Sequence, residues 1–411
     1  MYKKITLLLV LLLLVLPVPA VRAQEEEDGL ELVCSEEYYR ALDGQNIAIN
    51  VYNWGEYISD GSDDMLNVNK AFEQATGIRV YYSTYATNEE LYSKLRGGGA
   101  QYDVIIPSDY MIGRMISEGM LEPLDFAHIP NYEFIDDNFR YPEYDSENRY
   151  SVPYTWGVVG IIYNTDLVYE DEVDSWDILW DERYMGNILM FSNPRDAFAI
   201  AQRRLGYSLN TTDPAELQRC LELLQDQKLL VQAYVMDEIF DKMLGGEAAL
   251  APYYAGDAFT MIDENPALDF AVPREGTNIF VDAACIPRGS KNRLAAEMYI
   301  NFLCEPTVSA ANGEYIGYAL PSQTAVAMLD DEVRESPVAY PPQKVVDNAE
   351  YFGALPRDTN LLMDKMWTEL LSTDEKYSKL LIPVFLILSI TVSVLINVMR
   401  GQRKRKQKNY F

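Results

Sequence analysis

Apolar residues alternate with polar ones in several short stretches of the first third of the chain. In the first of them, Ile47, Ile49 and Val51 alternate with smaller or polar residues, as in a half-buried β-strand. Between such stretches, apolar residues recur at helical spacing. The predicted order of strand, helix, strand, helix, strand occupies residues 46–52, 63–76, 78–82, 88–96 and 102–106. This alternation predicts an α/β fold.

The pattern changes at residues 150–163, which are strand-like throughout and rich in aromatic residues. We interpret this stretch as a strand that crosses from one lobe to a second lobe. Residues 277–284 are expected to form a strand that crosses back. The predicted first lobe spans residues 46–153 and is completed by about 282–325, and the second spans 154–281 and is completed by about 326–372.

The first 23 residues have the features of a secretory signal peptide. Lys3 and Lys4 precede an apolar run at residues 5–16, and Val-Arg-Ala at residues 21–23 supplies the small residues of a cleavage site. An uncleaved anchor is the alternative, although the apolar run is short for one. Residues 24–45 follow as an acidic spacer.

Residues 380–399 form a second hydrophobic segment, which contains no charged residue. As a helix this segment would be about 30 Å long, which is enough to cross a bilayer. Six Lys or Arg residues follow within residues 400–411, so the positive-inside rule predicts a basic cytoplasmic tail. We therefore expect a single C-terminal transmembrane helix that anchors an extracytoplasmic body, in the periplasm or on the outer face of the cell membrane.

The chain has a formal net charge of −29 at pH 7. Because both ends are basic, the acidic excess lies in the spacer and the predicted lobes. A strongly acidic body repels nucleic acid and attracts cations over long distances, and it lacks the basic stripe of a nucleic-acid-binding protein. Solubility is the alternative explanation for many of these acids.

The sequence contains few histidines and cysteines. His128 is the single histidine, which argues against a zinc site and against a Ser-His-Asp triad, since both depend on imidazole. We therefore expect no catalytic activity, no metal and no cofactor. The four cysteines form no C-x-x-C pair, and the sequence leaves open whether Cys285 and Cys304 are bridged.

Candidate chemistry lies at the ends of two predicted strands. The first strand runs into Trp54, Glu56 and Tyr57, and the strand at residues 102–106 is followed by Pro-Ser-Asp-Tyr at residues 107–110. In open α/β sheets, ligands bind beyond the carboxyl ends of strands. Aromatic rings together with carboxylates suit a cation. The alternative for each aromatic residue is a place in the core.

Several longer motifs resemble those of a known family. They include Val-Tyr-Asn-Trp-Gly-Glu-Tyr at residues 51–57, Pro-Arg-Asp-Ala-Phe at 194–198 and Ile-Gly-Tyr-Ala-Leu-Pro at 316–321. The chain resembles, over about residues 46–372, the extracytoplasmic spermidine/putrescine-binding proteins of ABC transporters. The resemblance implies the two-lobed periplasmic-binding-protein fold (type II), with crossing hinge strands and a polyamine in the cleft between the lobes.

The resemblance also implies which residues bind the ligand. By position in the shared motifs, Trp54 corresponds to an aromatic wall, and Asp196 and Asp282 correspond to carboxylates that bind amines. Asp257 matches an acid of putrescine-preferring members. The implied ligand-binding set is Trp54, Glu56, Tyr57, Ser108, Tyr110, Asn193, Asp196, Tyr254, Asp257, Phe280, Asp282 and Tyr318.

The sequence departs from the family pattern at several of these positions. Asn193 stands where spermidine binders tend to have an aspartate, and Phe280 and Tyr254 each replace a tryptophan. Phe352 lies near the place of an expected glutamine. Because a shorter diamine needs fewer carboxylates, the pattern leans slightly toward putrescine.

The resulting hypothesis is a monomeric, membrane-tethered receptor that passes putrescine or spermidine to an ABC permease for import. One alternative is a receptor for another cation such as ferric iron, for which Tyr81, Tyr82 and Tyr85 are the weak indication. A second alternative is an extracellular sensor or enzyme on one transmembrane helix. The short tail without a domain argues against a sensor, and the missing nucleophile motif argues against a hydrolase.

Overall fold

The computed structural model describes residues 30–99 and 101–372. The strands are β1 Ala48–Trp54, β2 Arg79–Tyr85, β3 Val104–Ile105, β4 Ser151–Asn164, β5 Ile188–Phe191, β6 Val231–Val235, β7 Leu250–Tyr254, β8 Leu268–Ala271, β9 Asn278–Cys285 and β10 Glu350–Tyr351. The helices are α1 Glu36–Tyr39, α2 Val68–Thr76, α3 Asn88–Arg96, α4 Asp109–Ser117, α5 Pro194–Leu205, α6 Pro214–Gln227, α7 Glu238–Leu244, α8 Ala255–Glu264, α9 Arg293–Leu303, α10 Pro306–Ile316, α11 Gln323–Val326, α12 Asp331–Arg334 and α13 Gln343–Asp347. Residues 357–372 form a further helix.

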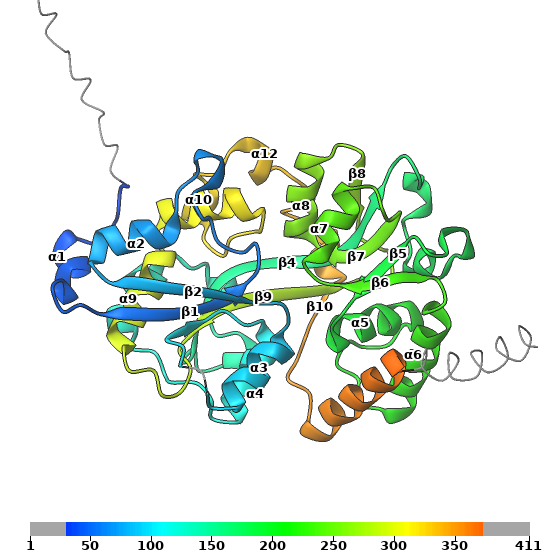
Figure 1. Cartoon of the computed structure of the whole chain (residues 1–411), viewed down its shortest axis with the longest axis horizontal. Coiled ribbons are helices and arrows are strands. Elements are labelled where there is room, and N and C mark those ends of the chain that lie inside the picture. The colour runs from blue at the N-terminus through cyan, green and yellow to red at the C-terminus, as the bar shows by residue number, and fades with distance from the viewer. Residues whose placement is uncertain (1–29, 100, 373–411) are drawn as a thin grey trace, which may run out of the picture. The chain divides into compact units, whose positions relative to one another are not determined.

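The strands hydrogen-bond in the order β2-β1-β3-β9-β4-β7-β5-β6, with β10 beside β9 and β8 beside β4. β1 is parallel to β2 and β3, and β5 is parallel to β6 and β7. The two parallel parts belong to different lobes, and the antiparallel pair β4–β9 runs between them (Figure 1). The predicted two-lobed α/β fold with crossing strands is confirmed.

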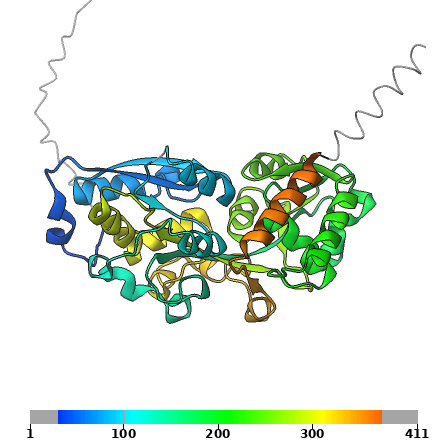
Figure 2. The same cartoon turned by 90° about the horizontal axis from the view of Figure 1, so that it is seen from below.

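β4 is long and almost entirely buried, since 13 of its 14 residues are buried. A strand covered on both faces along its whole length is expected where two lobes share it. Figure 2 shows the two lobes on either side of the connecting strands, with the helix of residues 357–372, drawn in orange, on the lobe that contains α6. Lys228 Nζ, just after α6, donates a hydrogen bond to the carbonyl of Leu370 at 2.7 Å.

The predicted fold class needs one correction. No helix within residues 30–99 and 101–372 is long and apolar enough to cross a membrane. The fold of the described residues is the two-lobed α/β fold, without the transmembrane helix that we had included in the fold class. The predicted signal peptide, the segment at residues 380–399 and the basic tail lie outside the described residues.

The four cysteines are free thiols. Cys285 is fully buried in β9, and Cys304 follows α9 in the same lobe. The pairing that the sequence left open is therefore not formed in this structure.

Glu305 attaches the N-terminal segment to this lobe. Its carboxylate is fully buried and accepts hydrogen bonds from the backbone N–H groups of Val33 at 2.7 Å and Cys34 at 3.0 Å. The hydroxyl of Tyr39 donates a third hydrogen bond at 2.7 Å. Three donors satisfy a charge that would otherwise be costly to bury.

Glu305→Gln is expected to lower the free energy of unfolding by about 2 kcal/mol, because hydrogen bonds to a charged acceptor are lost and an amide N–H₂ faces backbone donors. Urea unfolding measures the difference. Glu332→Gln, at an exposed position of α12, is the control and should change stability by less than about 0.5 kcal/mol. Equal effects of the two substitutions would contradict the assigned role of Glu305.

Candidate functional site

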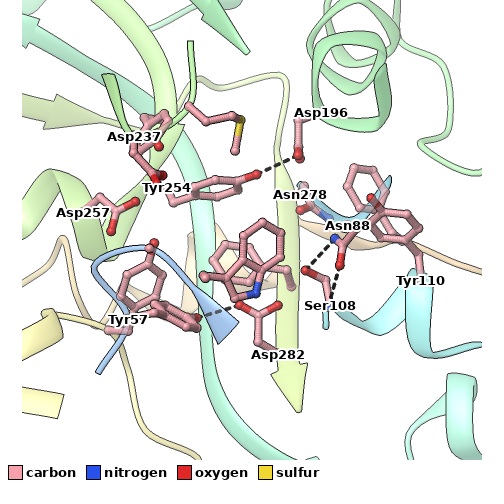
Figure 3. A pocket seen from close by; sticks show the side chains of 17 residues that line it. Tyr57, Asn88, Ser108, Tyr110, Asp196, Asp237, Tyr254, Asp257, Asn278 and Asp282 are labelled. Carbon is pink, nitrogen blue, oxygen red and sulfur yellow. Dashed lines mark hydrogen bonds between the residues drawn. The ribbon is translucent and has the colours of Figure 1, made fainter. Parts of the chain in front are cut away.

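A cavity lies where the two lobes meet the crossing strands (Figure 3). It contains about 540 Å³ of space not filled by protein atoms, part of it open to solvent. The lining consists of Trp54, Gly55, Tyr57, Asn88, Ser108, Tyr110, Asp196, Met236, Asp237, Tyr253, Tyr254, Asp257, Asn278, Phe280, Asp282, Tyr318 and Phe352. Both lobes and the crossing strand β9 therefore contribute to the cavity.

β9 places three side chains on the cavity. Asn278, Phe280 and Asp282 are two residues apart, and alternate residues of a strand point to the same face. Asp282 is only 4% exposed. Burial is the main cause that raises the pKa of Asp282 to about 6.

The two oxygens of Asp282 differ in their surroundings. Oδ2 accepts a hydrogen bond from the hydroxyl of Tyr57 at 2.6 Å, and that hydroxyl also contacts Thr155 Oγ1. Oδ1 is buried and has no hydrogen-bond partner among the described residues. A buried carboxylate oxygen without a donor is costly, so Oδ1 is available to a cationic or hydrogen-bond-donating ligand.

Asp196 lies in the first turn of α5, where it is 7% exposed. Its Oδ2 accepts a hydrogen bond from the hydroxyl of Tyr254 at 2.8 Å (Figure 3). Burial raises the pKa of Asp196, while the hydrogen bonds from Tyr254 and at Asn193 act in the opposite direction. Asp196 is thus a second buried carboxylate, held in place by a tyrosine and the start of a helix.

Asp237 and Asp257 lie on the other side of the cavity from Asp196 in the view of Figure 3. Asp237 lies two residues beyond the end of β6 and directly before α7, and Asp257 lies in the first turn of α8. Burial raises the pKa of Asp257 well above its usual range, and the charge of Asp237 adds to that effect. Burial, followed by the charges of Glu238 and Glu56, raises the pKa of Asp237 to about 6.

Aromatic rings form a continuous wall between these carboxylates. Tyr254 packs edge-on against Phe280, with ring centroids 5.4 Å apart, and Phe280 lies 6.3 Å from Tyr318. Tyr318 in turn meets Tyr57 at 4.7 Å and 89°. Such rings offer apolar surface to methylene groups and negative faces to cations.

Ten of the twelve residues predicted as ligand-binding line this cavity, and Glu56 and Asn193 do not. Glu56 adopts a left-handed backbone conformation, with φ of 45°, and its exposed side chain lines a neighbouring groove instead. Asn193 is the N-cap of α5, and its Oδ1 accepts a hydrogen bond from the backbone N–H of Asp196 at 2.9 Å. The binding role of the other ten stays a prediction.

The prediction missed several lining residues. Asn88, Met236, Asp237, Tyr253 and Asn278 line the cavity, and none lies in a motif that we had used. Asp237 had a usable signal, because it lies two residues beyond the end of a strand, much as Ser108 lies three residues beyond the end of β3. The tyrosines that had suggested a ferric-ion receptor are absent from the lining, and Tyr81 is 55% exposed.

Residues 67–341 match the sequence profile of a family described as bacterial extracellular solute-binding protein. The chain belongs to this family. It is 35% identical over 308 residues to the spermidine/putrescine-binding periplasmic protein of Escherichia coli, covering 74% of this chain and 86% of that protein. The resemblance that we had drawn from the sequence motifs is therefore confirmed.

A second curated relative and a solved structure agree with this family assignment. The putrescine-binding periplasmic protein PotF of Escherichia coli is 27% identical over 352 residues, covering 80% of this chain and 93% of that protein. The structure of a spermidine/putrescine ABC transporter protein from Listeria monocytogenes matches with a TM-score of 0.75 and 34% identity, covering 79% of this chain and 98% of that chain. The chain is thus similar to transporter binding components rather than to enzymes.

Proposed function

We propose that the protein captures a polyamine, such as spermidine or putrescine, outside the cytoplasm and delivers it to an ABC permease for import. The observation that carries this proposal is a cavity with buried, unneutralised carboxylates and an aromatic wall. Among the described residues, Asp282 Oδ1 has no hydrogen-bond partner, and none of those that line the cavity is a Lys or an Arg. A linear polycation supplies both the missing charge and the methylene groups that aromatic faces cover.

The arrangement of the lobes supports capture by closure. Two glycines lie directly against side chains of the opposite lobe: a Cβ on Gly256 would lie 2.2 Å from the ring of Tyr318, and one on Gly55 would lie 2.3 Å from Asp237 Oδ2. Side chains from both lobes therefore meet over the cavity. Rotation about the crossing strands, the usual hinge motion of two-lobed binding proteins, would expose the cavity to solvent.

Titration calorimetry of the purified protein with spermidine and putrescine tests the proposal. We expect one-to-one binding and a rise in the melting temperature with ligand, since a ligand that binds only the folded state stabilises it. 1,4-Butanediol, which has hydroxyls in place of the ammonium groups of putrescine, is the control and should not bind. Absence of heat and of thermal stabilisation with both amines, in a folded sample, would overturn the proposal.

A further inference from the structure

Asp237 stands apart from the other carboxylates of the cavity because its carboxylate lies directly against the backbone of the opposite lobe at Gly55. It lies in the turn between β6 and α7, in the second lobe, while Gly55 follows β1 in the first. A Cβ on Gly55 would lie 2.3 Å from Asp237 Oδ2 and 3.1 Å from its Cγ. The carboxylate therefore occupies space that only a glycine at position 55 leaves free.

Asp237 also forms the boundary between the cavity and a neighbouring groove, since it lines both. The side chain is exposed. The acidic residues that line the groove are Glu56, Asp63, Asp237, Asp241, Asp263, Glu264 and Glu314. An ammonium group that reaches Asp237 thus lies at the mouth of the cavity, away from Asp196.

The carboxylates of the cavity outnumber the charges of a diamine. Four of them, Asp196, Asp237, Asp257 and Asp282, belong to the lining, whereas putrescine carries two ammonium groups. Burial raises the pKa values of these carboxyl groups, so each one that is ionised in the bound state needs an ammonium group beside it. A triamine leaves fewer such groups in the closed cavity than a diamine does.

We propose that Asp237 binds the third ammonium group of a linear triamine, and that Gly55 sets the position of its carboxylate when the lobes close. This inference rests on the proposed polyamine-binding function. Asp237 is then a specificity-determining residue, and it favours spermidine or a longer polyamine over putrescine. The proposal reverses the slight preference for putrescine that the sequence had indicated.

The test compares Asp237→Asn and Gly55→Ala, titrated with spermidine and with putrescine. Asp237→Asn should weaken spermidine binding by about tenfold to a hundredfold, the effect of removing a hydrogen bond to a charged group, and putrescine binding by less than about threefold. Gly55→Ala should show the same selectivity, because its methyl group displaces the carboxylate of Asp237. The double variant should bind spermidine no more weakly than Asp237→Asn alone, since both changes remove one interaction.

Asp241→Asn is the matched control, because Asp241 lines the groove but not the cavity. It should leave both affinities within about twofold, as a distant surface charge does at physiological salt. Equal weakening of both amines by Asp237→Asn, or no weakening of either, would overturn the inference while leaving the polyamine function intact. Failure of the unchanged protein to bind either amine would instead refute the proposed function.

Discussion

Replacing Asp282 with asparagine is expected to weaken polyamine binding by about a hundredfold to a thousandfold. Asp282 lies at the centre of the lining on β9, and its Oδ1 has no partner among the described residues. An ammonium group bound there would lose its counter-charge in a buried site, which costs roughly 3–5 kcal/mol when one partner of a buried pair is removed. The amide has nearly the same shape, so the loss would come from charge.

The same substitution is expected to leave the free protein at least as stable as before. Burial raises the pKa of Asp282 to about 6, which means that the ionised carboxylate is unfavourable in the empty folded protein at neutral pH. The amide oxygen of asparagine still accepts the hydrogen bond from Tyr57. Binding and stability should therefore respond in different ways, which separates a loss of the ligand contact from a loss of the fold.

Calorimetry and thermal melting of Asp282→Asn measure these two effects. Asp226→Asn, at an exposed position of α6, removes one negative charge far from the cavity and controls for long-range attraction. It should change the affinity by less than about threefold. If Asp282→Asn melts normally and binds both amines as tightly as the Asp226→Asn control, the central role of Asp282 is wrong.

The prediction of the fold and of most of the cavity rested on features local in sequence. Alternating apolar residues gave β1, and the residues that follow a strand must lie at its carboxyl end, where ligands collect. Trp54, Tyr57, Ser108 and Tyr110 were placed correctly for this reason. The period of two along β9 likewise puts Phe280 and Asp282 on one face.

Two predicted residues lie outside the lining because another physical effect decides the direction of the side chain. The Oδ1 of Asn193 caps α5 by accepting a hydrogen bond from the backbone N–H of Asp196. Glu56 lies at a left-handed turn, which directs it out of the cavity. Asp237 was missed although it lies just beyond the end of β6, and its approach to Gly55, 182 residues away in sequence, is a contact that no local pattern encodes.

Polyamine affinity is expected to fall as the pH falls from 7.5 to 5. The ligand needs ionised carboxylates, and burial raises the pKa of Asp282 to about 6 and also raises the pKa values of Asp196 and Asp257. At pH 5 only about a tenth of a carboxyl group with a pKa of 6 is ionised, which alone lowers the affinity about tenfold. The alkyl ammonium groups stay charged over this range, as the Lys side chain does.

Calorimetry at several pH values, in two buffers of different ionisation enthalpy, measures both the affinity and the protons released. Near pH 6 binding should release protons, because the cation displaces them from the carboxyl groups.

The folding stability of the free protein should change with pH in the opposite direction to the affinity. Acids whose pKa is raised in the folded state take up protons on folding, so their contribution to stability improves as the pH falls through about 6. An affinity independent of pH, with heats that do not depend on the buffer, would show that the carboxylates are already ionised before the ligand binds. Carboxyl groups that stay ionised at pH 5 would contradict the pKa of about 6 that burial gives Asp282, and the cavity would then have to be open to solvent in the free protein.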